Sequence, residues 1–404
     1  MASSGAVAQL LTLALTPILT RLYRPEDFGI LASIQTYSTI LALLLFFSME
    51  YSLVRASDDR ELGVNISASL LIFSVTSLVL LSIIIGAPEV FLYVGFARII
   101  DYPYLTYSAT ITTALLAFST QLMISRERYN TLAIMNVLQA ILRFLIAIVI
   151  YYTFYTSISL ALANVIALFF ASLFLIFRFE FSGITISLSF LESIKNICKN
   201  SELVVFNTSA SVVNVVLSNF PFVYILANYS LEASGAFALA YRVISMPVAL
   251  INRAVSNVLL KELSKIKARG SAAFGFLMKN FMLLLICFPF FVLIGWQGAN
   301  LFSLVFGPQW QESGSLASLL SVGLFFSFCI SPLSTFYIAY DKNKYFILLS
   351  VVFLFFLVFN AQDFSTVLDF VYFYTMVSSA YYLVNLFTVF YLARNYDKGI
   401  FRNG

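Results

Sequence analysis

The stretch LLIFSVTSLVLLSIII, from Leu70 to Ile85, decides the fold class of this protein. It contains no charged side chain, and Phe346 to Phe359 is a second run of the same kind. A helix of about 20 apolar residues crosses the ~30 Å hydrocarbon core of a bilayer. The strands of a membrane β-barrel would alternate apolar and polar residues over about ten positions. Because lipid offers no partners for backbone polar groups, these runs predict membrane-spanning α-helices.

Apolar stretches of this length recur along the whole chain of 404 residues. Hydrophobic residues make up 61% and charged residues 10% of the sequence, whereas soluble domains carry about 25% charged residues. We predict an all-α integral membrane protein with about twelve transmembrane helices, at residues 3–21, 29–49, 64–86, 104–124, 131–152, 158–178, 203–226, 234–260, 274–296, 316–339, 345–360 and 366–392.

Basic residues between these spans predict the orientation of the chain. Sixteen lie in the loops of one side, and only Arg21, Arg24 and Arg98 lie on the other. Because basic residues accumulate in cytoplasmic loops, both termini are expected in the cytoplasm, which requires an even number of spans. The net charge of +4 is spread over short loops and forms no compact patch, so no nucleic-acid partner is expected.

A cytoplasmic connection divides the chain into residues 1–178, a linker at 179–200, and residues 201–404. Apolar residues recur at helical spacing within the linker, and charged residues occupy its other faces. This pattern predicts an amphipathic helix on the membrane surface, and a partner-binding helix is the alternative. The apolar positions are Leu188, Leu191, Ile194 and Ile197.

An internal repeat supports this division. The pattern E-x-x-G-x-x-A occurs at Glu26–Ala32 and again at Glu232–Ala238, 206 residues later. A second pattern, basic-x-basic-Tyr, occurs at Arg126–Tyr129 and at Lys342–Tyr345, 216 residues later. Two parallel six-helix repeats are a transporter arrangement, in which the substrate site is expected between the halves. Chance similarity is the alternative reading.

Residue types that the sequence lacks exclude several chemistries. There is no histidine, no phosphate-binding G-x-x-x-x-G-K-[ST] loop, and no spacing of Cys198, Cys287 and Cys329 that predicts a metal site. We therefore expect no catalytic residue, metal or cofactor. The competing class is a membrane-embedded glycan polymerase or transferase. Its catalytic acids would need an external loop, yet the longest expected ones, at 87–103 and 297–315, are short.

Three arginines fall inside the expected spans. Arg143 follows Gln139 by one helical turn on a polar face, and Arg242 precedes Arg253 by eleven residues, about three turns. A charge near mid-membrane costs at least ~2.5 kcal/mol, so these residues predict a cationic, substrate-binding lumen. Arginine bonding to backbone carbonyls is the structural alternative, and Arg253 could also extend its side chain to the cytoplasm.

Polar stripes follow two of the expected spans at helical spacing. One contains Asn207, Ser211 and Asn214, and the other contains Thr12 and Thr16. We predict that these residues line the cavity, where they would suit a ligand rich in hydroxyl groups. Polar stripes also hold membrane helices together, so a purely structural role is an equal alternative.

Four segments, in order, resemble bacterial flippases for lipid-linked polysaccharide repeat units, the Wzx type. These are LTPILTRLYRPEDFG at 15–29, GAFALAYRVISMP at 235–247, FGPQW at 306–310 followed by Gly314, and SPLS at 331–334. The resemblance covers most of the chain. It differs at the N-terminus, where the resemblance implies a short basic segment but the first span begins almost directly; an alternative start site or a trimmed chain would account for this difference.

The resemblance implies membership of the multidrug/oligosaccharidyl-lipid/polysaccharide exporter superfamily, with two six-helix lobes in a V around a central cavity. It implies a polyprenyl diphosphate-linked oligosaccharide as substrate, for O-antigen, capsule or exopolysaccharide, and a multi-pass position in the bacterial inner membrane. It also implies a glycan polymerase and a chain-length regulator as partners. The coupling ion, H⁺ or Na⁺, stays open, and another lipid or drug exporter is the alternative within the superfamily.

Overall fold

The computed structural model describes residues 2–93, 96–181, 184, 190–201, 203–361 and 364–403. All the regular structure in this part of the chain is helical, which confirms the predicted fold class. The elements are α1 (Ala2–Leu22), α2 (Pro25–Phe46), η1 (Met49–Tyr51), α3 (Ser52–Arg55), α4 (Asp59–Gly86), α5 (Val90–Tyr93), η2 (Ala97–Ile99), α6 (Pro103–Ser125), α7 (Tyr129–Phe154), α8 (Ser159–Arg178), α9 (Phe190–Lys199), η3 (Leu203–Asn207), α10 (Thr208–Asn228), α11 (Leu231–Ala268), α12 (Phe274–Leu284), η4 (Leu285–Cys287), α13 (Phe288–Phe306), η5 (Pro308–Trp310), α14 (Gln311–Ile330), η6 (Ser331–Ser334), α15 (Thr335–Ala339), α16 (Asn343–Asn360) and α17 (Val367–Asn403).

Eleven helical segments in the described ranges are long and apolar enough to cross a membrane. They correspond to the predicted spans other than the seventh, residues 203–226. There the chain forms the short π-helix η3 and then α10, which has 21 residues and therefore the length of a membrane span. The protein is thus a multi-pass membrane protein of about twelve spans.

One predicted loop is wrong. Residues 297–315 were expected to form an external connection, but α13 continues to Phe306 and α14 begins at Gln311. The chain turns within a few residues at Gly307, whose φ of 114° is accessible mainly to glycine. The small and polar residues of 297–315 therefore pack helices together: a Cβ on Gly298 would lie 2.5 Å from the backbone oxygen of Gly314.

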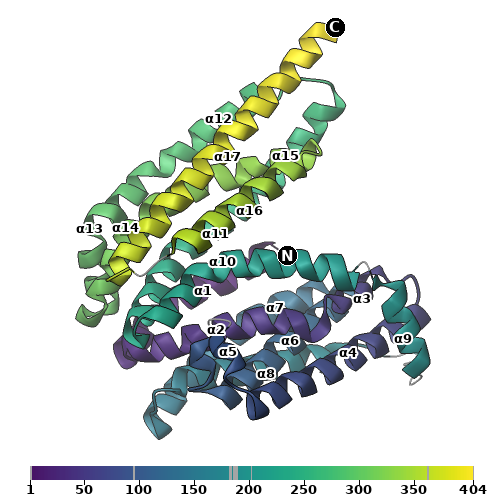
Figure 1. Ribbon diagram of the computed structural model, residues 1–404, viewed down its shortest axis with the longest axis vertical. Coiled ribbons are helices and arrows are strands. Elements are labelled where there is room, and N and C mark those ends of the chain that lie inside the picture. Colours follow the sequence, from purple (N-terminus) through teal and green to yellow (C-terminus); the bar gives the residue numbers. More distant parts are fainter. Residues whose placement is uncertain are drawn as a thin grey trace. The chain divides into compact units, whose positions relative to one another are not determined.

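The chain divides into two compact units, Ser3–Gly235 and Ala236–Gly404 (Figure 1). The first unit includes α10, which packs against α2. Its core lies among α2, α4 and α6, where the Phe46 ring stacks on Phe73 and on Phe118 with centroids 4.9 and 5.1 Å apart. In the second unit, α14 packs against both α13 and α17. The sequence boundaries at 1–178, 179–200 and 201–404 stay a prediction.

Within the first unit, the E-x-x-G repeat marks a reciprocal helix contact. A Cβ on Gly29 would lie 1.9 Å from the Leu231 backbone oxygen, and a Cβ on Gly235 would lie 1.8 Å from the Pro25 backbone oxygen. Gly29 and Gly235 are each the fifth residue of their helix. The two glycines therefore let the first turns of α2 and α11 approach at backbone distance.

The second sequence repeat lies in equivalent loops but in a shifted register. Glu127 and Asp341 both adopt positive φ, 54° and 56°, after a helix end. The next residues, Arg128 and Lys342, each donate a backbone hydrogen bond to the carbonyl five residues before. Structurally equivalent residues in the two loops are therefore 214 positions apart in the chain. The sequence pattern pairs residues 216 positions apart, so its alignment is shifted by two residues.

Candidate functional site

Arg143 joins two elements that the sequence marked separately. Its Nη2 donates to the Thr12 hydroxyl oxygen at 3.1 Å, which ties α7 to α1. The Thr12 hydroxyl in turn donates to the Ala8 carbonyl at 2.9 Å. The Arg143 side chain is half-buried, so the guanidinium is only partly shielded. The structure thus brings together one predicted cation and one predicted polar lining residue.

Aromatic residues hold the end of α1 against α7. The Tyr23 hydroxyl donates to the Ala147 carbonyl at 2.7 Å, and the Tyr23 ring packs edge-on against Tyr151 with centroids 5.3 Å apart. Tyr23 is fully buried. Two long-range hydrogen bonds therefore join α7 to α1 and to the residue that follows it, one from Arg143 to Thr12 and one from Tyr23 to Ala147.

The other predicted lining residues of the first unit differ in their surroundings. Thr16 is buried and donates to the Thr12 carbonyl of its own helix at 2.7 Å. Gln139 and Ser211 are half-buried, and Asn214 is exposed. Asn207 is the last residue of the π-helix η3, so the predicted stripe crosses a change in helix type. The lining role of these residues stays a prediction.

In the second unit, Arg242 is half-buried. The preceding residue, Tyr241, lines a small cavity of about 40 Å³, and Arg242 is not among the lining residues. This volume exceeds the ~15 Å³ that one water molecule needs. The Thr375 hydroxyl is buried without a hydrogen-bond partner among the described residues. Arg253, further along α11, is exposed. The cavity is lined by Tyr241, Leu320, Gly323, Leu324, Ser327, Tyr374, Thr375, Ser378 and Tyr382.

A buried amide network was missed by the sequence reasoning. Asn196 of α9 donates to the Asn65 side-chain oxygen at 2.7 Å, and Asn65 donates to the Ser52 carbonyl at 2.8 Å. Lys199 forms an ion pair with Glu61 of α4 at 3.1 Å. The available signal was Asn65, an amide side chain near the start of the expected span 64–86.

This network fixes how α9 lies. Its polar residues Ser193 and Asn196 are buried, whereas Phe190, Leu191 and Ile194 are exposed. In Figure 1, α9 lies beside the start of α4. The amphipathic helix therefore docks on the protein by its polar face. Contact of the apolar face with a membrane surface stays a prediction, and Leu188 lies outside the described residues.

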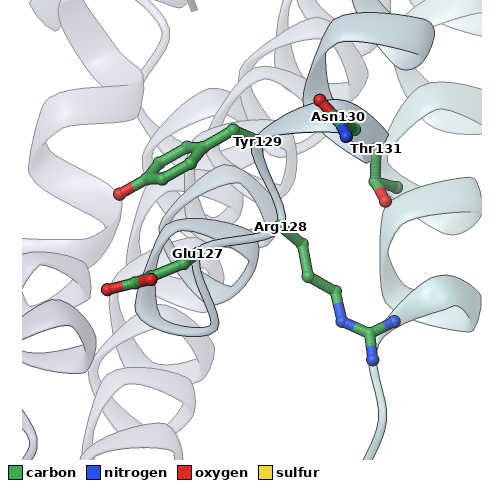
Figure 2. A pocket seen from close by; sticks show the side chains of 5 residues that line it. All are labelled: Glu127, Arg128, Tyr129, Asn130 and Thr131. Carbon is green, nitrogen blue, oxygen red and sulfur yellow. The ribbon is translucent and has the colours of Figure 1, made fainter.

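A further hollow of about 420 Å³ lies at the α6–α7 loop and is lined by Glu127, Arg128, Tyr129, Asn130 and Thr131. Figure 2 shows the Glu127 and Tyr129 side chains on one side and Arg128 extending away from them. Arg128 forms an ion pair of 2.6 Å with Glu180 and keeps the pKa of that carboxyl below its usual range. This ion pair, with the hydrogen bond from Arg128 to the Arg178 carbonyl, braces the end of α8.

No group of three or more metal-binding side chains comes together in the described part of the chain. The predicted site residues supply guanidinium and hydroxyl groups on helices. Such groups can bind an anionic, hydroxyl-rich molecule.

Comparisons with solved structures show the fold. A Lipid II flippase MurJ in an inward closed conformation has a TM-score of 0.77 at 14% identity, covering 95% of this chain and 87% of that one. An inward-facing multidrug resistance MATE family transporter of the MOP superfamily has a TM-score of 0.71 at 13% identity, covering 98% and 96%. An outward-facing one has a TM-score of 0.53 at 15% identity, covering 99% and 96%.

No curated protein is detectably similar to this sequence. A family model described as polysaccharide biosynthesis protein matches residues 18–315, which is most of the chain. The match agrees with the resemblance drawn from the sequence motifs, and the structural neighbours are exporters and flippases of the MOP superfamily. The chain therefore belongs to the polysaccharide biosynthesis protein family.

Proposed function

We propose that this protein is a flippase for a polyprenyl diphosphate-linked oligosaccharide, the repeat unit of an O-antigen, a capsule or an exopolysaccharide. The observation that carries the proposal is the family match over residues 18–315. It is supported by a shared fold with a protein named as a Lipid II flippase. The protein would act in the bacterial inner membrane with both termini in the cytoplasm, as the loop charges predict.

The arginines supply the chemistry that such a substrate needs. A lipid diphosphate and any acidic sugar are anions, and arginine stays ionised and can bind phosphate or carboxylate with two parallel hydrogen bonds. Arg143 of the first unit and Arg242 of the second are half-buried on spanning helices, where a cation is costly unless it serves a ligand or a partner. The Thr12 hydroxyl beside Arg143 offers a sugar a hydrogen-bonding group.

Transport would proceed by alternating access. The lipid chain would stay in the bilayer while the charged head group passes through the protein from the cytoplasmic to the periplasmic leaflet. No bond of the substrate is made or broken, so the proposal requires no catalytic residue. A glycan polymerase and its chain-length regulator would use the product at the far side of the membrane.

A reconstitution experiment tests the proposal. Purified protein in liposomes is given a fluorescent polyprenyl diphosphate-linked oligosaccharide, and access of the sugar to the opposite leaflet is measured over time. We expect Arg143→Lys and Arg242→Lys to lower the rate by about tenfold or more, because losing a charge-assisted hydrogen bond costs about 1.5 kcal/mol or more. Arg60→Ala is the matched control, since Arg60 is exposed on the first turn of α4.

Two outcomes would contradict the proposal. Folded protein that moves no labelled substrate under any imposed ion gradient would favour an exporter of other lipids or drugs. Cells lacking the protein that accumulate single repeat units on the periplasmic face, instead of the cytoplasmic face, would favour a membrane-embedded polymerase or transferase.

A further inference from the structure

A sharp corner follows α2 and buries an acidic residue. The helix ends at Phe46, and both Phe47 and Ser48 adopt left-handed backbone conformations, with φ of 46° and 58°. Two consecutive non-glycine residues in this region are energetically unfavourable and are often retained for function. The corner leads into η1, where Met49 is fully buried and the Glu50 side chain is only 8% exposed.

Among the described residues, the Glu50 carboxyl forms no ion pair. Its Oε2 is buried and lacks a hydrogen-bond partner among the described residues. Four elements, α3, α4, α6 and η3, pack against η1. The last of these is a single turn of π-helix, a type of irregularity that is frequent at functional sites.

The charged groups of these elements are engaged elsewhere or exposed. On α4, Asp59 pairs with Arg126 at 2.6 Å and Glu61 pairs with Lys199 at 3.1 Å. Arg60 of α4 and Arg55 of α3 are exposed. Neither α6 nor η3 contains an acidic or basic residue. Among the described residues, the other titratable groups on these elements are Tyr104 and Tyr107 of α6, and η1 itself contains Tyr51. The pKa of Tyr51 is raised mainly by burial and further by Glu50.

An unpaired carboxylate in such a place is costly, and binding a proton removes the cost. Burial raises the pKa of Glu50 to about 7, although a hydrogen bond from its own backbone N–H lowers it in part. Near neutral pH, a small change in solvent access is therefore enough to change its protonation state.

We propose that Glu50 is a proton-binding site that couples an H⁺ gradient to transport; this inference rests on the flippase function proposed above. When the corner opens to water, the carboxylate takes a proton from hydronium and leaves water. When it opens in the other state of the cycle, the O–H bond breaks and the proton returns to water. In the closed corner the carboxyl is neutral and needs no partner.

Infrared spectroscopy tests the proton site without any substrate. The wild-type protein in liposomes is titrated from about pH 5 to about pH 9 while the C=O stretch of neutral carboxylic acids is followed. We expect one band to disappear with a midpoint near 7, and to be absent throughout in Glu50→Gln. A wild-type spectrum identical to that of Glu50→Gln across this range would overturn the proposal.

Transport under imposed gradients tests the coupling. We expect a pH gradient to accelerate transport by the wild type and by Glu50→Asp. The acceleration of transport should be more than about tenfold smaller in Glu50→Gln, which corresponds to about 1.4 kcal/mol. Glu89→Gln is the control, because Glu89 is an exposed carboxylate after α4. Undiminished acceleration in Glu50→Gln overturns the coupling, as does acceleration by Na⁺ alone. A wild type without transport refutes the flippase function, and the infrared titration then decides the proton site by itself.

Discussion

The two ends of α2 each bury a carboxyl group, and they treat it in opposite ways. At the start, Asp27 is 2% exposed and its Oδ2 accepts hydrogen bonds from the Arg24 backbone N–H at 2.9 Å and from the Tyr155 hydroxyl at 3.0 Å. After the other end, Glu50 is 8% exposed and its Oε2 has no partner in the described part of the chain. Burial is therefore similar, and only the partners differ.

The comparison distinguishes a carboxyl group that stabilises the fold from one that has another role. Asp27 is the third residue of α2 and closes a capping box with the N-cap Arg24, so its hydrogen bonds hold the helix start together and offset part of the cost of its burial. A buried carboxyl without such partners is stable only when neutral. We therefore assign Asp27 to folding and Glu50 to proton binding, and four substitutions can break or sharpen that assignment.

The largest effect is expected at the start of α2. Gly235→Leu places a side chain where even a Cβ would lie 1.8 Å from the Pro25 backbone oxygen. Backbone atoms cannot move aside as the end of a flexible side chain can, so we expect the variant not to fold. The yield of monodisperse protein after size-exclusion chromatography measures this. Gly5→Ala is the control, because nothing lies within 4 Å of that site; normal yield of Gly235→Leu would show that the contact is dispensable.

The next effect concerns Glu50 and depends on pH. Its pKa in the folded protein, about 7, lies above the ordinary value of 4.5, so the folded state is fully stable below about 4.5 and loses stability as pH rises toward 7. Glu50→Gln removes this loss. We expect the variant to be more stable by up to about 3 kcal/mol at pH 8 and equal to the wild type near pH 4. Thermal unfolding in detergent measures the difference, and a pH-independent difference would contradict the assignment.

A smaller loss is expected for Asp27→Ala. It leaves the Arg24 backbone N–H of the capping box and the Tyr155 hydroxyl without their acceptor, which costs about 2 kcal/mol. The melting temperature should fall at neutral pH. Asp27→Asn should recover part of it, since asparagine also caps helices. A variant that melts normally but no longer responds to a pH gradient would place proton binding at Asp27.

The smallest effect is expected for Tyr155→Phe. It removes one of the two hydrogen bonds to Asp27 and should cost about 1 kcal/mol. Combined with Asp27→Ala, the second substitution should add almost nothing, because the two residues act on the same contact. Full additivity of the two melting-temperature changes would show that Tyr155 stabilises the protein only through the contacts of its ring with other aromatic rings.

Much of the fold could be predicted from the sequence, because long apolar runs report membrane helices directly. The turn at Gly307 could not, since the neighbouring small and polar residues resemble a loop although they pack α13 on α14. Arg143 and Thr12 were both expected at the site, but their 3.1 Å hydrogen bond joins helices more than a hundred residues apart in the chain. Likewise, the sequence shows Glu50 only as an acidic residue directly after the expected span 29–49. Its isolation results from the corner and from the elements that surround η1.

The left-handed pair Phe47–Ser48 has a consequence for directed evolution. Glycine adopts positive φ freely, so Ser48→Gly should relieve the corner and raise the stability of the closed form. A library of variants selected only for heat resistance should therefore be enriched in glycine at position 48. A library selected for growth that depends on surface polysaccharide should reject it, because a relaxed corner would no longer favour opening.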